Sequence, residues 1–270
     1  MSNIIESRRP LAAITGASDG LGKEFAKQLA ADGYDLLLVA RRGNLLEKIK
    51  LEYESQFGIN VETLVCDLSR PDDVKALELR LANEEFLEFM INNAGFGREG
   101  MFPEVDPDLE EEMIRVHIIS LMRLSRAALV PMCKRRRGFL INLSSVAAFL
   151  FGTNCAEYMA TKAYVYSFSR SIQCDVSEYN VRVQALCPGL THTGFHSAET
   201  MKGFQKDKTP GFLWLNADYV VRTSLNAIRK TKRVVCIPSF RYKLILALLS
   251  NPIGSKICEW AYRKRAKNKT

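Results

Sequence analysis

A glycine-rich turn near the start of the chain places the strongest limit on its fold. The apolar run 11–15 leads into Thr15-Gly16-Ala17-Ser18-Asp19-Gly20-Leu21-Gly22, and residues 23–31 continue with helical period. Glycines in such a strand–turn–helix let the backbone approach a pyrophosphate, and the helix N-terminus supplies amide donors and a favourable dipole. We therefore predict a nucleotide site here in preference to a purely structural turn. The predicted cofactor-binding residues are Thr15, Gly16, Ser18, Asp19, Gly20, Leu21 and Gly22.

Apolar runs alternate with longer segments of helical period along the rest of the chain. This alternation is typical of βαβ units around a parallel sheet. We predict strands at 11–15, 35–40, 61–66, 89–92, 139–143, 181–186 and 234–237. Helices are predicted at 23–31, 45–56, from Pro71, at 107–133, at 155–178 and at 218–229. The expected fold is α/β, a doubly wound parallel sheet of about seven strands with helices on both faces.

Length and cysteine usage indicate one domain in a reducing compartment. No linker, repeat or low-complexity tract interrupts the 270-residue chain before residue 240, so we predict a single domain over 1–240 and a tail over 241–270. The seven cysteines are scattered and contain no C-x-x-C pair, which argues against a disulfide framework and against a metal site. Residues 1–10 lack the apolar segment of a signal peptide. We therefore expect a cytoplasmic protein.

The positive charge of the chain belongs to its tail. Of the formal net charge of +8, residues 241–270 carry +7 through eight basic residues and one acidic residue, which leaves +1 for residues 1–240. A nucleic-acid-binding face across the domain is therefore disfavoured. The apolar stretch 244–249 is far shorter than the ~20 residues that span a bilayer. Peripheral contact with an anionic membrane and a helix packed on a neighbouring subunit or on the domain both stay open.

The end of the second predicted strand favours NADP(H) over NAD(H). NAD-binding enzymes usually carry Asp or Glu there to bond the ribose hydroxyls. This chain reads Val39-Ala40-Arg41-Arg42, so the acidic residue is replaced and two guanidinium groups could clamp a 2′-phosphate. The alternative is an exposed arginine pair at the start of a helix.

Polar residues also follow the third and fourth predicted strands. Asp67-Leu68 ends the third strand and Asn92-Asn93-Ala94-Gly95 ends the fourth. Ligands bind at the carboxyl ends of strands in open α/β sheets, so we predict cofactor contacts from Asp67, Leu68, Asn93, Ala94 and Gly95. Asp67 is equally suited to cap the helix that begins at Pro71.

A tyrosine and a lysine four residues apart indicate acid–base chemistry. Tyr158 and Lys162 would share one face of the helix predicted at 155–178. A free phenol titrates near pH ~10, and a neighbouring cation lowers that pKa toward the range that proton transfer requires. Ser145 could hold a substrate oxygen against the phenol. Taken alone, such a pair is usually two surface neighbours.

Together these motifs resemble the short-chain dehydrogenase/reductase family over about residues 9–240. The elements that carry the resemblance are Thr15-Gly16-x-x-x-Gly20-x-Gly22, Asn92-Asn93-Ala94-Gly95, Ser145, Tyr158-x-x-x-Lys162 and Pro188-Gly189. The resemblance implies a Rossmann-type fold and hydride transfer between nicotinamide and a carbonyl or alcohol. It implies that Tyr158 is the acid/base, that Ser145 orients the substrate oxygen, and that Lys162 lowers the phenol pKa and bonds the nicotinamide ribose. It also places Pro188, Gly189, Thr191 and Thr193 beside the nicotinamide and phosphates, and implies a homodimer or homotetramer.

One position departs from the family pattern. The long fourth helix of the family usually carries an Asn that belongs to a water relay behind the lysine, and this chain has His117 there. An imidazole can donate, accept and shuttle protons, so we expect a modified relay in which His117 takes part in catalysis. The alternative is a packed, neutral histidine with the relay lost.

The segments around the predicted site indicate a hydrophobic substrate. The family resemblance implies a substrate lid at about 194–215, and this segment contains Phe195, Met201, Phe204, Phe212, Leu213 and Trp214. Residues 149–151 would line the opposite wall, although both groups could simply pack the lid. We predict an NADP(H)-dependent oxidoreductase, in particular a reductase, acting on a 3-oxoacyl, steroid-like or other lipid carbonyl. The alternatives are an NADP(H)-binding sensor or scaffold without turnover, and a peripheral membrane protein that acts through its tail.

Overall fold

Seven parallel strands form one sheet at the centre of the molecule. The computed structural model describes residues 8–197, 201 and 209–249. The sheet order is β3-β2-β1-β4-β5-β6-β7 and every pairing is parallel, which confirms the predicted doubly wound sheet. The chain builds outward from β1 to β3 and then returns to the other side of β1, so β1 and β4 flank the point where ligands bind in such sheets. The strands are β1 Leu11–Thr15, β2 Asp35–Ala40, β3 Val61–Val65, β4 Leu87–Asn92, β5 Gly138–Leu143, β6 Val181–Leu186 and β7 Val235–Cys236.

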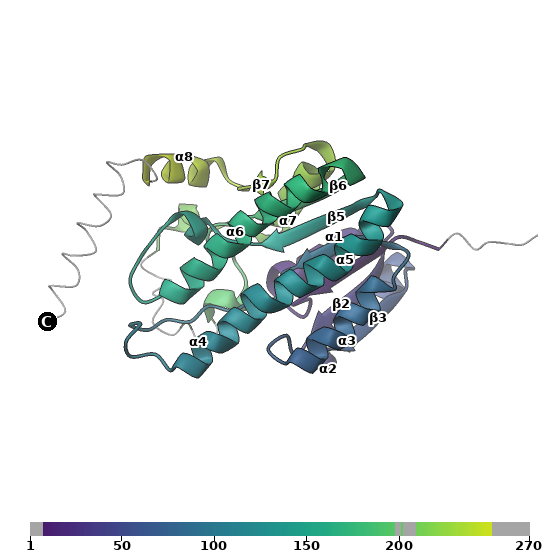
Figure 1. Ribbon diagram of the computed structural model, residues 1–270, viewed down its shortest axis with the longest axis horizontal. Helices are drawn as coiled ribbons and strands as arrows, with labels where there is room; N and C mark the ends of the chain where they lie inside the picture. Colours follow the sequence, from purple (N-terminus) through teal and green to yellow (C-terminus); the bar gives the residue numbers. More distant parts are fainter. Residues whose placement is uncertain (1–7, 198–200, 202–208, 250–270) are drawn as a thin grey trace, which may run out of the picture.

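Helices cover both faces of the sheet (Figure 1). In β1, Ala12 and Ile14 pack into the hydrophobic core on one face while Leu11 and Ala13 pack into the core on the other, which explains the uninterrupted apolar run. Helices α1, α2 and α7 contribute to the first core, and α3, α5 and α6 to the second. The helices are α1 Gly20–Ala31, α2 Gly43–Phe57, α3 Pro71–Ala82, α4 Pro107–Ile114, α5 Leu121–Arg135, α6 Ala156–Val176, α7 Ala217–Lys230 and α8 Phe240–Leu249.

The helix predicted over residues 107–133 is interrupted. Between α4 and α5 the chain forms a π-helical segment, Arg115–Ser120, which contains His117. Such π-helical turns are frequent at functional sites. Among the described residues, one helical run, Pro107–Arg135, is long and apolar enough to cross a membrane when only length and composition are considered. Over half of its most apolar 18-residue stretch is buried against the rest of the protein. Its composition is therefore that of a core helix.

The first part of the predicted tail is helix α8, which packs against the rest of the protein. Tyr242 and Leu246 of α8 are 7% and 6% exposed, and Tyr242 belongs to the hydrophobic core shared with α1 and α7. Residues 250–270 of the predicted tail, and Phe204 with its neighbours in the predicted lid, lie outside the described residues.

Candidate active site

The glycine turn after β1 is closely packed. Gly16 and Gly20 have φ values of 67° and 54°, in the left-handed region that favours glycine. A Cβ on Gly22 would lie 2.2 Å from the Gly16 carbonyl oxygen, so only glycine fits there. The Asp19 carboxylate accepts a hydrogen bond from the Gly20 amide at 2.7 Å and thereby caps α1. The N-terminus of α1 therefore lies next to a turn that has few side-chain atoms.

Two buried side chains fasten this turn to the end of β4. The Thr15 hydroxyl accepts hydrogen bonds from the Asn93 and Ala94 amides at 3.0 and 3.1 Å. The Asn93 side-chain amide donates to the carbonyls of Thr15 and Gly16 at 2.9 and 3.2 Å. Thr15 and Asn93, predicted to bind cofactor, therefore shape the turn through bonds within the protein. The close approach of Asn93 explains why Gly16 and Gly22 must lack side chains, because a Cβ on either would lie 2.8 or 2.5 Å from its amide nitrogen.

The two arginines after β2 take different directions. The Arg42 guanidinium donates to the Ser18 hydroxyl at 2.8 and 3.1 Å, which holds it beside the glycine turn. Arg41 instead lies 3.8 Å from Glu112 of α4. Ala40 ends β2 and leaves no carboxylate at that position. Of the two arginines, Arg42 is therefore the one that lies beside the glycine turn, and the Asp19 carboxylate lies 3.9 Å from its guanidinium.

Asp67 does not cap α3. Its carboxylate accepts hydrogen bonds from the amide and hydroxyl of Ser69 at 3.0 and 2.8 Å, and the N-cap position of α3 is Arg70. Burial alone would raise the pKa of Asp67, but the bonds from Ser69 and the charges of Arg41 and Arg70 outweigh it and lower the pKa. Asp67 is thus an ionised acceptor at the carboxyl edge of the sheet. The Leu68 side chain turns away into the hydrophobic core, so only its backbone borders the site.

Ser145, Tyr158 and Lys162 come together at the ends of β5 and α6. The Ser145 hydroxyl accepts from the Ala147 amide at 3.1 Å and lies close enough to the Tyr158 phenol to lower its pKa. The Lys162 ammonium lies 5.6 Å from the centroid of the Tyr158 ring and donates to the Leu143 carbonyl at 3.0 Å. Lys162 is only 4% exposed. The arrangement combines a hydroxyl, a phenol and a cation around one point at the carboxyl edge of the sheet.

Burial decides the protonation of this group. It raises the pKa of Tyr158 to about 12, opposed by the hydrogen bond from Ser145. The expected lowering of the phenol pKa by Lys162 is therefore not found. Burial also lowers the pKa of Lys162 to about 8, partly offset by Cys187. Near neutral pH the phenol keeps its proton and the lysine keeps its charge.

His117 is held between the loop after β4 and α6. Its Nε2 accepts from the Phe96 amide at 3.0 Å, and its Nδ1 lies 3.0 Å from the Thr161 hydroxyl, which donates to the Tyr158 carbonyl. This pattern assigns the ring proton to Nδ1. Burial and the Lys162 charge lower the pKa of His117 well below 6.5. The imidazole is neutral, and both of its nitrogens are hydrogen-bonded within the protein. No ring nitrogen is left to pass a proton along the expected relay. His117 therefore matches the alternative of a packed, neutral histidine.

The segment after β6 closes the site from the other side. Pro188 accepts from the Val146 amide at 3.0 Å, directly after Ser145. Thr193 packs against Gly20, because a Cβ added to Gly20 would lie 3.1 Å from the Thr193 side chain. The lid therefore begins over the glycine turn. Within the same segment, the Thr191 hydroxyl donates to the Gly189 carbonyl at 2.9 Å. On the opposite side, Gly95 in the loop after β4 lies against His117. The predicted cofactor positions thus line one continuous edge, and the bare turn beside Arg42 and Ser18 fits a dinucleotide phosphate.

An aromatic side chain of the lid lies over Tyr158. The Phe195 ring centroid is 5.9 Å from that of Tyr158. A Cβ on Gly97, in the loop after β4, would lie 2.6 Å from the Met201 sulfur and 3.0 Å from Phe195. Trp214 stacks on His192 at 5.1 Å between ring centroids. The substrate side of the site is therefore aromatic and apolar.

Sequence reasoning missed Tyr242 of α8. Its hydroxyl accepts from the Leu190 amide at 2.9 Å and donates to the Leu213 carbonyl at 2.8 Å. Its ring lies on Gly189, where a Cβ would approach to 2.0 Å. Tyr242 thus fixes both the segment that leads into the lid and the end of the lid. Because the contact joins residues about fifty positions apart, no local signal in the sequence marks it.

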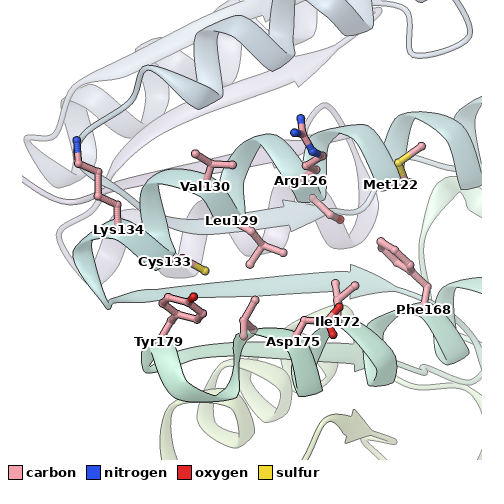
Figure 2. A pocket seen from close by; sticks show the side chains of 12 residues that line it. Met122, Arg126, Leu129, Val130, Cys133, Lys134, Phe168, Ile172, Asp175 and Tyr179 are labelled. Carbon is pink, nitrogen blue, oxygen red and sulfur yellow. The ribbon is translucent and has the colours of Figure 1, made fainter.

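A surface groove lies away from these groups. A groove of about 480 Å³ runs between α5 and α6. Figure 2 shows apolar side chains from both helices facing it, with Arg126 and Lys134 among its polar lining. Val130 and Tyr179, at the groove, are 55% and 43% exposed. The groove therefore belongs to the outer surface of the helix layer and not to the catalytic cleft. Its apolar lining includes Met122, Leu129, Val130, Phe168, Ile172 and Tyr179.

Comparisons with known proteins agree with this geometry. A family model described as short chain dehydrogenase matches residues 10–202. A very-long-chain 3-oxoacyl-CoA reductase-like protein of Arabidopsis thaliana is 34% identical over 182 residues, which are 66% of this chain and 58% of that protein. The very-long-chain 3-oxoacyl-CoA reductase of Mus musculus is 27% identical over 95% of this chain and 83% of its own length.

A solved structure is similar over most of the fold. The short-chain dehydrogenase from Sphingobium yanoikuyae in complex with NADPH is 30% identical, with a TM-score of 0.81, and the match covers 87% of this chain and 91% of that chain. The family match covers both the glycine turn and the group formed by Ser145, Tyr158 and Lys162. This chain belongs to the short-chain dehydrogenase/reductase family of oxidoreductases.

Proposed function

We propose that the protein is an NADPH-dependent reductase that converts the carbonyl of a hydrophobic substrate, in the first place a 3-oxoacyl thioester, into an alcohol. The observation that carries the proposal is the placement of Ser145 and a protonated Tyr158 beside the buried Lys162. A phenol with a pKa of about 12 holds its proton at neutral pH, which is the state needed to donate a proton during reduction.

The side chains divide the chemistry among them. A nicotinamide bound along the carboxyl edge would supply the hydride. Ser145 donates a hydrogen bond to the substrate oxygen, and Tyr158 transfers its proton to that oxygen as negative charge develops there. The Lys162 ammonium stabilises the resulting phenolate until solvent returns a proton. His117 holds Thr161, and through it the Tyr158 backbone, in place.

We propose NADPH as the coenzyme because Arg42 and Ser18 form a phosphate-binding pair where Ala40 replaces a carboxylate. The NADPH-bound relative, 30% identical, supports this choice. Charge-assisted hydrogen bonds contribute about 1.5–3 kcal/mol, so Arg42→Ala should raise the KM for NADPH roughly 10- to 100-fold. The KM for NADH should stay unchanged.

Arg222→Ala is the matched control, because Arg222 lies on α7 and pairs only with Asp218 among the interactions recorded for it. Arg41→Ala should have a smaller effect than Arg42→Ala, since Arg41 is directed toward Glu112. Equal use of NADH and NADPH by the wild type would overturn the coenzyme assignment and leave the proposed chemistry standing.

The proposed substrate class follows from the apolar walls. Phe195 covers one side of Tyr158, and Met201 lies against Gly97 in the loop after β4. Phe149, which packs on Tyr166 at 4.8 Å between ring centroids, lies just after Ser145. Relatives named as very-long-chain 3-oxoacyl-CoA reductases support an acyl substrate. NADPH oxidation should be measured with 3-oxoacyl-CoA esters of increasing chain length, ketosteroids and small aldehydes. We expect kcat/KM to rise with chain length; equal turnover of small hydrophilic aldehydes would contradict the assignment.

We propose a homodimer, or a homotetramer built from it, with the groove between α5 and α6 facing a second copy. Exposed apolar side chains such as Val130 and Tyr179 support this, because a folded monomer rarely leaves such a groove open to water. Light scattering should give a multiple of 30.5 kDa for the wild type. Val130→Glu should shift it toward the monomer, and a monomeric wild type would overturn the proposal.

We propose a cytoplasmic location with peripheral contact to anionic membranes through residues 241–270. The six cysteines in the described residues are all free, as expected in a reducing compartment. The net charge of +7 over residues 241–270 supports attraction to anionic lipid. Co-sedimentation with anionic vesicles at low salt tests the contact, and absence of binding would remove it.

A further inference from the structure

Helix α8 is apolar on both sides. Tyr242 and Leu246 face the protein and are almost fully buried. Phe240, Leu244 and Leu248 follow one another at intervals of four residues, so they share one side of the helix. They are 76%, 52% and 59% exposed. This short helix therefore exposes a row of three large apolar side chains on one side.

The end of the lid lies beside this helix. The Arg241 guanidinium donates to the Phe212 carbonyl at 2.7 Å, and Phe212 itself is 60% exposed. The bond between Tyr242 and Leu213 holds the neighbouring residue of the lid against the same helix. We call Phe212, Phe240, Leu244 and Leu248 the apolar face. Large exposed apolar patches of this kind mark surfaces that contact a protein or a membrane.

The charge around the apolar face identifies its partner. Arg241 and Lys243 are exposed on α8, beside the apolar face. The sequence that follows, residues 250–270, adds six basic residues and one acidic residue. Apolar side chains that enter a lipid surface, flanked by clustered Lys and Arg, are the combination that binds anionic bilayers. A protein partner would have to match the apolar residues and the positive charge on one surface.

Helix α8, which carries the apolar face, adjoins both walls of the proposed substrate site. Tyr242 bonds Leu190, just before the lid, and Leu213 near its end, and α8 packs on the 3-10 turn Val146–Phe149 that follows Ser145. We propose that the apolar face docks on an anionic lipid bilayer and brings the mouth of the site to the membrane surface. This inference rests on the membrane contact proposed above, and it assigns that contact to α8 and the lid in addition to the charged tail.

The experiment uses the full chain and vesicles of two compositions. Binding is measured by sedimentation with vesicles of phosphatidylglycerol and phosphatidylcholine in equal parts, and with vesicles of phosphatidylcholine alone. The test variant is Phe240→Ser with Leu244→Ser. The control variant is Leu51→Ser with Leu79→Ser, which removes two leucines that are 67% and 59% exposed on α2 and α3.

We expect the wild type and the control variant to bind the anionic vesicles alike, and the test variant to lose affinity at least ~10-fold because two inserted apolar side chains are removed. Melting temperature and NADPH-dependent turnover of a water-soluble carbonyl should be the same in all three proteins. Turnover therefore tests the reductase separately from the membrane contact.

Three results would overturn the docking face. If the test variant binds as tightly as the wild type while replacing the six basic residues of 250–270 with Gln abolishes binding, the membrane contact stands without α8. If the wild type binds neither kind of vesicle, both the contact and the face fail. If the test variant changes from a larger to a smaller oligomer in light scattering without any change in lipid affinity, the apolar face covers a second copy of the chain.

Discussion

The nucleotide side and the substrate side of the cleft are built in opposite ways. On the nucleotide side, buried Thr15 and Asn93 bond the glycine turn to β4, and neighbouring atoms leave no room for a Cβ on Gly22. On the substrate side, Phe195 lies over Tyr158 and Met201 lies against Gly97, and these contacts are apolar. Directional hydrogen bonds hold the nucleotide side in place. The substrate side is held by apolar contacts that other side chains of similar size could also make.

This contrast matches the demands of the two ligands. A coenzyme has one fixed shape, so a preformed polar turn binds it at low entropic cost. An apolar substrate is recognised mainly by area and shape, which aromatic residues from several segments supply. Tyr158 stands at the border: its hydroxyl lies near Ser145, and its ring contacts Phe195 and His117. Substitutions on the two sides should therefore have different signatures.

The largest effect is expected at the border. Tyr158→Phe removes the proton donor and should lower kcat roughly 100- to 10,000-fold while NADPH binding is unchanged. Steady-state kinetics and a fluorescence titration with NADPH measure the two quantities. Tyr164→Phe is the control, because that tyrosine lies on the same helix and stacks on Phe168. Turnover that survives in Tyr158→Phe would assign the proton to another group.

The next effect tests how rigid the nucleotide side is. Gly22→Ala places a Cβ against the Gly16 carbonyl and should lower the free energy of unfolding by about 1–3 kcal/mol. NADPH affinity should fall with it, because the turn must shift. Gly211→Ala, where nothing lies within 4 Å of the added Cβ, is the control and should leave both quantities unchanged. Equal effects at the two glycines would remove the proposed difference between the two regions.

A smaller effect should appear in the pH dependence of stability. His117 is held neutral when folded, with a pKa well below 6.5, whereas the unfolded chain binds a proton near pH ~6.5. The contribution of His117 to the free energy of unfolding is therefore complete above that pH and falls by up to about 1.4 kcal/mol per pH unit below it. Urea unfolding at several pH values should show a shallower acid loss in His117→Asn than in the wild type.

His192→Asn is the control for this measurement, since His192 is exposed and stacks on Trp214. It should keep the wild-type slope. If His117→Asn also shifts the pH profile of kcat/KM, the imidazole takes part in proton transfer after all, and the packed, neutral role assigned to it is wrong.

The smallest effect is expected on the substrate side. Phe195→Ala should raise the KM for an apolar ketone only about fivefold, because roughly 1 kcal/mol of apolar contact is lost. The KM for NADPH should not change. Phe102→Ala, at a phenylalanine that is 64% exposed, is the control. A loss of kcat as large as that of Tyr158→Phe would mean that Phe195 positions the tyrosine and that the two regions are equally rigid.

The sequence alone determined the order of strands and helices, the glycine turn and the group formed by Ser145, Tyr158 and Lys162. These features depend on periodicity and on residues close together in the chain, such as Tyr158 and Lys162 on one helix. Strand ends and helix starts were predicted to within a few residues, and the parallel order followed because crossover helices separate every pair of strands.

Only the tertiary structure decided how the residues behave. Burial raised the pKa of Tyr158 against the expected influence of Lys162, and it left His117 neutral between Phe96 and Thr161. Long-range packing also directed Arg42 to Ser18 and placed Tyr242 on Gly189. The physical reason is the same throughout: desolvation and hydrogen bonds between segments 20 to 50 residues apart depend on the folded neighbourhood, which no local pattern records.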